Sequence, residues 1–149
     1  MKKLLILLTI ALGFALFSCI PNDRIVLETD PDALTWVEID ADTLQAKIDA
    51  MADFVLIVSS ETCITCADFE PIVDAMITTY GVVVYKIEAG AAFPGTNEIF
   101  DYRYTPTVAV FAGGELQAAT DPAKTERAFE SVERLVDWLD YYVAFPILE

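Results

Sequence analysis

A pair of cysteines at the junction between a strand-like and a helix-like segment constrains the fold of this chain more than any other feature. The apolar run 54–58 ends shortly before Cys63, and a helical pattern begins at Cys63 and Cys66. An uninterrupted apolar run is typical of a central strand covered on both faces. Further along, Thr105 and Pro106 open another apolar run. Two thiols at the mouth of a helix that follows a buried strand suit dithiol–disulfide exchange, especially with a distant X-Pro step.

The hydrophobic pattern along the rest of the chain alternates between strands and helices. Apolar runs predict strands at residues 36–39, 54–59, 82–87, 108–112 and 115–119. Helical spacing predicts one helix up to about residue 51, one from 63 to about 80, a short one at 97–102 and a last one from 122 onward. Thr62 is expected to cap the second helix, and Asp40 or Asp42 the first. This order predicts an α/β fold with a mixed sheet between helices.

The N-terminal segment has the features of a secretory signal. Lys2 and Lys3 precede an apolar run at 4–17, which is short for a membrane span. Residues 16–19 have the sequence Leu-Phe-Ser-Cys and resemble the lipobox of bacterial lipoproteins, which implies cleavage before Cys19 and a diacylglycerol on its sulfur. An uncleaved N-terminal anchor and an ordinary signal peptide are the alternatives. We expect a signal peptide at 1–18, a tether at 19–34 and one domain at 35–149, outside the cytoplasm.

Composition excludes several classes of function. The chain has 24 acidic and 9 basic side chains, a formal net charge of −15, and no basic patch for nucleic acid. It has no histidine, so Cys/His zinc sites and histidine-based acid–base catalysis are excluded. We expect neither a metal nor a cofactor. With Cys19 as the lipid site, only Cys63 and Cys66 remain, and the fold is expected to rest on its hydrophobic core.

The residues around the cysteine pair resemble the thioredoxin family, over about residues 35–142. Beside the two cysteines, the matching positions are Pro71, Lys86, Thr105-Pro106-Thr107 and Gly113-Gly114-Glu115. The resemblance implies a thioredoxin-like three-layer α/β/α sandwich with a mixed central sheet. It also implies a cis peptide bond before Pro106 and a buried side chain for Lys86. The departures from the family are Thr62 in place of tryptophan, Ile64-Thr65 in place of Gly-Pro, and Ile57 in place of a buried aspartate.

The resemblance also implies roles in exchange chemistry. Cys63 would be the exposed attacking thiolate at the helix N-terminus, where backbone N–H groups and the helix dipole favour negative charge. Cys66 would be more buried and would resolve the mixed disulfide. Thr105 and Pro106 would present backbone groups to an extended substrate segment, as a short added strand. The alternatives for the cysteine pair are a structural short-loop disulfide or a redox-dead relic, and the alternative for Pro106 is a trans proline that opens an ordinary edge strand.

Two charged residues near the pair are further candidates for the site. Cys66 must lose a proton when it attacks, and the position of the family's aspartate holds Ile57. Glu61 is the nearest candidate base in the sequence, or it is an exposed carboxylate without that role. Lys86 either faces the pair and favours a thiolate or extends to solvent.

These features predict a membrane-anchored, extracytoplasmic thiol–disulfide oxidoreductase that exchanges disulfides with protein substrates. We expect its partners to be protein thiols or disulfides, a redox partner protein and, through a lipid anchor, the bacterial cell membrane. We expect a monomer that binds no nucleic acid. The alternative is a non-catalytic thioredoxin-fold module of a surface or secretion complex, which the loss of the acidic residue at Ile57 favours. The direction of electron flow stays open, because reductases, oxidases and isomerases share these parts.

Overall fold

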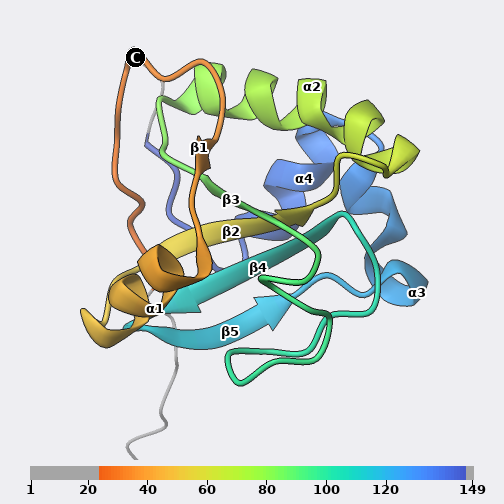
Figure 1. The fold of residues 1–149 in the computed structure, drawn as a ribbon. Helices are drawn as coiled ribbons and strands as arrows, with labels where there is room; N and C mark the ends of the chain where they lie inside the picture. Colours follow the sequence, from red (N-terminus) through yellow and green to blue (C-terminus); the bar gives the residue numbers. More distant parts are fainter. Residues whose placement is uncertain (1–23, 147–149) are drawn as a thin grey trace, which may run out of the picture.

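A mixed sheet of five strands forms the centre of the molecule (Figure 1). The structure is a computed structural model that describes residues 24–146. The strands are β1 (Val37–Glu38), β2 (Phe54–Ser59), β3 (Tyr85–Glu88), β4 (Thr107–Ala112) and β5 (Glu115–Ala119). Their order across the sheet is β1-β3-β2-β4-β5. The first three in this order run parallel, and β4 is antiparallel to both of its neighbours, so the predicted mixed sheet is confirmed.

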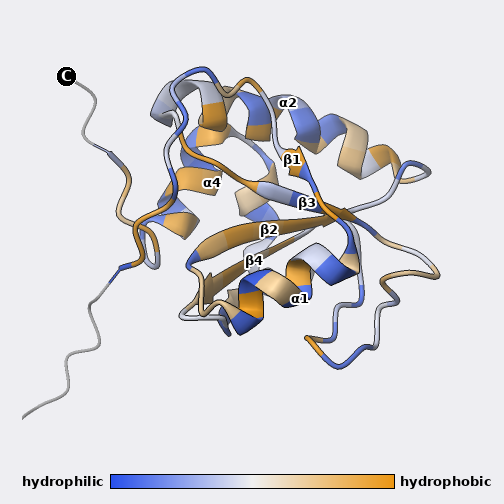
Figure 2. Cartoon of the chain, turned by 60° about the vertical axis from the view of Figure 1, so that its left-hand side comes forward, coloured by the Kyte–Doolittle hydropathy of each residue, from blue (hydrophilic) through white to orange (hydrophobic). Residues whose placement is uncertain are grey.

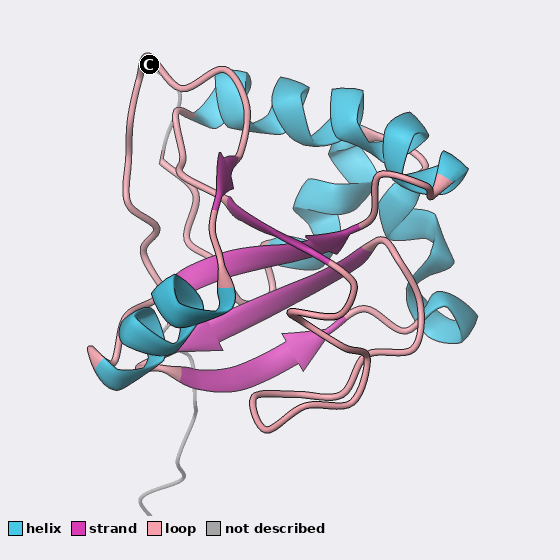
Figure 3. Ribbon diagram, viewed as in Figure 1, coloured by secondary structure: helices cyan, strands magenta, loops and turns pink. Residues whose placement is uncertain are grey.

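Helices cover both faces of the sheet, which gives the predicted three-layer sandwich (Figure 3). They are α1 (Ala41–Asp49), α2 (Ile64–Tyr80), α3 (Pro122–Thr125), the 3₁₀ helix η1 (Glu126–Phe129) and α4 (Val132–Leu139). In Figure 1, α2 and α4 lie above the sheet and α1 lies below it. Asp40 caps α1, because its carboxylate accepts the Thr43 N–H at 2.8 Å. None of the described helices is long and apolar enough to cross a membrane.

Strand β2 lies between two hydrophobic cores. All six of its residues are buried, as expected for a central strand. Because side chains alternate along a strand, Val55 and Ile57 pack toward α2 and α4, whereas Phe54 and Leu56 pack toward α1. Figure 2 shows β2 and β4 as hydrophobic along their length, while α1 and α2 carry hydrophilic residues outward. The first of these cores contains Phe69, Val73, Met76 and Ile77 and so packs α2 against the sheet.

The prediction of a short helix at residues 97–102 is wrong. These residues form an irregular loop. The Asn97 side chain accepts the N–H groups of Ile99 and Phe100 at 2.8 and 3.2 Å and donates to the Pro94 carbonyl at 2.8 Å. Such bonds are those of a helix N-cap, but no helical turn follows, because the Tyr102 N–H donates to the Gly95 carbonyl at 2.7 Å instead of to residue 98. The ring of Phe93 packs on nearby aromatic side chains of the loop and fixes it on the sheet.

The last helix is interrupted, although the sequence predicts a continuous one. It begins at Pro122 as expected, but η1 and a turn at Glu130 separate α3 from α4. Ser131 starts α4 anew, because its hydroxyl accepts the Arg134 N–H at 3.3 Å. Leu135 and Leu139 of α4 are fully buried against the sheet.

The segment that the sequence assigns to a free tether joins the domain from Arg24 onward. Arg24 forms an ion pair with Asp140 at 2.7 Å, and Ile25 exchanges backbone hydrogen bonds with residues 142 and 144. Ile25 and Leu27 are buried in the core under α2 and α4. Thr29 of the same segment forms an isolated bridge with Val82. β3 begins at Tyr85, three residues later than predicted. The predicted signal peptide, Cys19 and the rest of the tether lie outside the described residues.

Candidate active site at the start of helix α2

Cys63 occupies the N-cap position of α2. Its backbone is extended, with φ −93° and ψ 111°, and its Sγ accepts the Cys66 N–H at 3.1 Å. The prediction that Thr62 caps this helix is wrong, because its hydroxyl lies 3.2 Å from Ser60 Oγ instead. The chain leaves β2 at Ser59 and turns, so that the cap is Cys63, one residue after the expected Thr62. The Cys63 sulfur therefore lies beside the free Cys66 N–H of the first helical turn. This is a position in which negative charge on sulfur is stabilised.

Cys63 and Cys66 are joined in a disulfide, with Cα atoms 5.2 Å apart. The two cysteines differ in access to solvent. Cys66 is only 4% exposed and packs on the inner side of α2, whereas Cys63 is half-buried at the helix end. An incoming group can therefore reach Cys63 far more easily than Cys66.

The loop before β4 brings Thr105 to the cysteine pair from 42 residues away. The Thr105–Pro106 peptide bond is cis, as the resemblance implies, and Pro106 is buried. The Thr105 carbonyl oxygen lies 3.3 Å from Cys63 Sγ. A backbone acceptor thus stands directly beside the accessible sulfur, where an extended peptide can pair with it.

Thr65 is a site residue that the sequence analysis did not single out. Its Oγ1 lies 3.2 Å from Cys63 Sγ and 3.4 Å from the Thr105 carbonyl oxygen, and its side chain is exposed. The signal that indicates it is its place between the cysteines, in the first turn of α2. A short hydroxyl side chain there can reach back to the cap residue.

Lys86 is held by an acidic partner on the neighbouring strand. Its Nζ lies 2.8 Å from Glu38 Oε1 and 4.0 Å from Glu88 Oε2, and 5.4 Å from the ring centre of Trp36. The lysine side chain is 14% exposed, whereas that of Glu38 is 72% exposed. Lys86 therefore does not extend freely into solvent, and its charge is shared with the carboxylates of Glu38 and Glu88.

A hollow of about 220 Å³ lies between the cysteines and Lys86. Glu61 lies on its wall with an exposed side chain, and its backbone N–H donates to Glu88 Oε1 at 2.8 Å. The role of Glu61 as a base stays a prediction. The residues that line the hollow are Trp36, Ser59, Ser60, Glu61, Cys63, Cys66, Ala67, Glu70 and Lys86. Cys66, although buried, thus borders a space with two carboxylates and an ammonium group.

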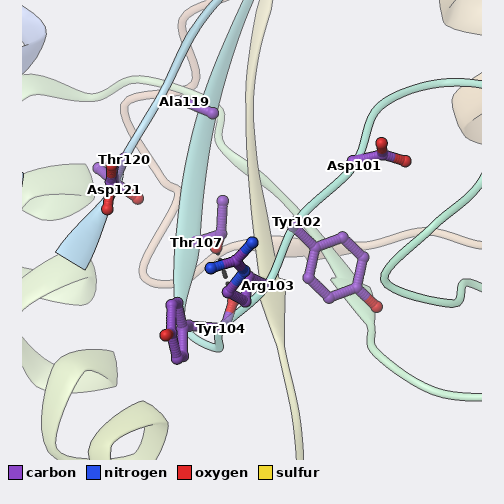
Figure 4. Close-up of a pocket in the computed structure, with 8 residues that line it drawn as sticks. All are labelled: Asp101, Tyr102, Arg103, Tyr104, Thr107, Ala119, Thr120 and Asp121. Atoms are coloured by element: carbon purple, nitrogen blue, oxygen red, sulfur yellow. Dashed lines mark hydrogen bonds between the residues drawn. The ribbon is translucent and has the colours of Figure 1, made fainter. Parts of the chain in front are cut away.

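A larger hollow of about 550 Å³ lies beside the cis-proline loop (Figure 4). It does not include either cysteine of the pair. Burial, together with the charge of Glu88, raises the pKa of Tyr102 in its wall. The lining residues are Asp101, Tyr102, Arg103, Tyr104, Thr107, Ala119, Thr120 and Asp121. Across residues 24–146, no group of three or more acidic or cysteine side chains is arranged to hold a metal ion.

Solved structures with the same chain path are thioredoxins. Neither a family model nor a curated protein matches the sequence. Thioredoxin f from spinach chloroplast is 18% identical, with a TM-score of 0.54, over 68% of this chain and 93% of that one. A variant thioredoxin from Halobacterium salinarum is 16% identical, with a TM-score of 0.55, over 80% and 99%. Thioredoxin f2, solved with ferredoxin:thioredoxin reductase, is 18% identical, with a TM-score of 0.55, over 72% and 94%. The chain therefore has the thioredoxin fold.

Proposed function

We propose that this chain is an extracytoplasmic thiol–disulfide oxidoreductase that acts on protein substrates through Cys63 and Cys66. One observation carries the proposal. A half-buried sulfur at a helix N-terminus is disulfide-bonded to a buried one and has the Thr105 carbonyl oxygen 3.3 Å away. A structural disulfide needs neither an accessible sulfur nor a backbone acceptor beside it, whereas an exchange site needs both.

The exchange can be written in the reducing direction. The Cys63 thiolate attacks one sulfur of a substrate disulfide, forms a mixed disulfide and releases the other substrate sulfur as a thiolate, which takes a proton from water. Cys66 then loses its proton and attacks Cys63 Sγ, which re-forms the internal disulfide and releases the second substrate thiolate. Two electrons pass from the dithiol to the substrate. A partner protein with a dithiol restores the reduced pair, and the reverse sequence oxidises a substrate dithiol.

The proton of Cys66 leaves through the hollow beside it rather than through the core. Ile57, at the position of the family's buried aspartate, is 1% exposed and packs among apolar side chains. Ile57 itself can therefore not accept this proton. Glu61 and Glu70 line the hollow that Cys66 borders, and Glu61 is the acceptor that we assign to this proton.

The surface around Cys63 suits a protein substrate. Ile64 is 80% exposed and Tyr104 is 53% exposed, and each stands next in sequence to a residue of the site. Exposed apolar side chains beside a polar backbone acceptor are typical of a docking surface. The thioredoxin f2 structure contains a reductase as its partner, and we assign a redox partner protein of that general kind to this chain.

A lipid on Cys19 would hold the domain close to the membrane through the Arg24 segment. Arg24 is fixed at the C-terminal end of α4 by its ion pair with Asp140. The five steps from Cys19 to Arg24 span at most about 18 Å. Cys63 lies at the N-terminal end of α2, about 25 Å from the other end of that helix, where the Asp30 N–H bonds to Gly81 at 2.8 Å.

A disulfide-exchange assay tests the proposed activity. The reduced protein should accelerate the reduction of insulin by a small dithiol, whereas a Cys63→Ser, Cys66→Ser double variant should leave the uncatalysed rate unchanged. The double variant is expected to fold, because the Cys63–Cys66 disulfide closes a loop of only a few residues and joins no distant parts of the chain. Equal rates of insulin reduction with the wild-type protein and the double variant, with the wild-type Cys63–Cys66 pair shown to be reduced by the dithiol, would favour the non-catalytic module instead.

A further inference from the structure

The hydroxyl of Thr65 lies between the accessible sulfur and the substrate-facing carbonyl. Its oxygen is 3.2 Å from Cys63 Sγ and 3.4 Å from the Thr105 carbonyl oxygen. A hydroxyl has one hydrogen, so it can donate to only one of these two acceptors at a time. Which acceptor receives the hydrogen depends on the charge of the sulfur.

In the disulfide form, the hydroxyl donates to the carbonyl. A disulfide sulfur carries no charge and is a weak acceptor, whereas a backbone carbonyl oxygen is a strong one. The Thr65–Thr105 hydrogen bond of the structure has this arrangement. The hydroxyl then occupies one of the two acceptor positions of the carbonyl oxygen and competes there with a substrate N–H.

In the reduced form, a thiolate on Cys63 changes the preference. Hydrogen bonds to a charged acceptor are about twice as strong as neutral ones. The Cys66 N–H, at 3.1 Å in the disulfide form, provides one donor to this sulfur, and the Thr65 hydroxyl is the nearest side-chain donor. A rotation about one side-chain bond is enough to turn its hydrogen from the carbonyl to the sulfur.

We propose that Thr65 is a positioning residue that transfers its hydrogen bond from the Thr105 carbonyl to Cys63 Sγ when the disulfide is reduced. The transfer stabilises the attacking thiolate and frees the carbonyl for a substrate N–H. When Cys66 closes the internal disulfide, with the two electrons passing to the substrate, the hydroxyl returns to the carbonyl and favours release of the product. This proposal rests on the proposed function only in taking Cys63 as the attacking thiol.

The test is the pH dependence of Cys63 alkylation in the reduced full-length protein. Thr65→Val keeps the shape of the side chain and removes the hydroxyl. It should raise the midpoint pH of iodoacetamide reaction at Cys63, mapped by peptide mass spectrometry, by about one pH unit, which is about tenfold in rate below the midpoint. Thr65→Ser should restore the wild-type midpoint.

Thr62→Val is the matched control. Thr62 is an exposed threonine next to Cys63, but its hydroxyl contacts Ser60 rather than the sulfur. Its replacement should leave the midpoint unchanged. A wild-type midpoint in Thr65→Val, or an equal rise in Thr62→Val, would overturn the proposal. Alkylation uses no protein substrate, so this outcome is separate from a failure of the exchange assay.

A second measurement follows the carbonyl itself. The ¹³C carbonyl resonance of Thr105 should move between the oxidised and reduced wild-type protein, because the carbonyl loses the Thr65 hydrogen bond on reduction. Most of this movement should be lost in Thr65→Val and kept in Thr62→Val. The same redox-dependent movement in Thr65→Val would contradict the transfer, even if the alkylation midpoint had risen.

Discussion

Cys66→Ser should accumulate protein substrates as mixed disulfides on Cys63, whereas Cys63→Ser should accumulate almost none. In the first variant, the half-buried sulfur at the helix N-terminus still attacks, but the thiol that would resolve the adduct is gone. In the second, the remaining thiol is 4% exposed and lacks the cap position. Loss of the charge-stabilising N–H contact, worth about 1.5 kcal/mol, alone slows attack by about tenfold or more.

Non-reducing gels of cell-envelope extracts are the measurement, with the double serine variant as the control for non-covalent binding. Adducts should disappear on reduction, and peptide mass spectrometry should place the bond at Cys63. Equal adduct yields from both single variants would mean that the roles of attacking and resolving thiol are assigned wrongly. A lack of adducts from either variant, with oxidised substrates present, would favour the non-catalytic module.

Cys19→Ala should move the protein out of the membrane fraction. Removal of the sulfur removes the attachment point of the proposed lipid, so the variant should be released or remain as an unprocessed precursor. The thioredoxin-fold domain should fold unchanged, because the first contacts of the described chain begin at Arg24. Fractionation followed by intact-mass analysis measures both the location and the acyl addition.

Ser18→Gly is the matched control for the anchor. It keeps a small residue before the cleavage position and should leave lipidation and membrane association unchanged. A wild-type protein in the membrane fraction without added acyl mass would contradict the anchor. That result would leave the thiol chemistry unaffected, because the two proposals depend on different cysteines.

The sequence predicts the centre of the fold well because the signal there is local and strong. The apolar run of β2, the cysteine pair and the step at Pro106 each have few alternative structures, and the sheet and the cis bond agree with them. Loop 97–102 is different, because the Tyr102 N–H bonds to the Gly95 carbonyl instead of closing a helical turn. Helical spacing in the sequence carries no information about that bond.

The contacts of the site were less predictable because they join distant segments. Ile25 and Leu27 lie in a polar, proline-punctuated stretch, and their burial depends on contacts with distant parts of the chain, such as the pairing of Ile25 with Val143. Glu38 becomes the partner of Lys86 through the parallel pairing of β1 with β3. Thr65 is next to a cysteine in sequence, yet its role depends on the Thr105 carbonyl, which the fold brings to it.

The reduction potential of the Cys63–Cys66 couple tests the central claim most directly. The full-length protein would be equilibrated in glutathione buffers of known potential, and the dithiol and disulfide forms would be separated after alkylation. An exchange site should give a reversible two-electron transition between about −120 and −270 mV, the range of thioredoxin-fold oxidoreductases. A potential below about −300 mV, typical of a structural disulfide, would contradict the account.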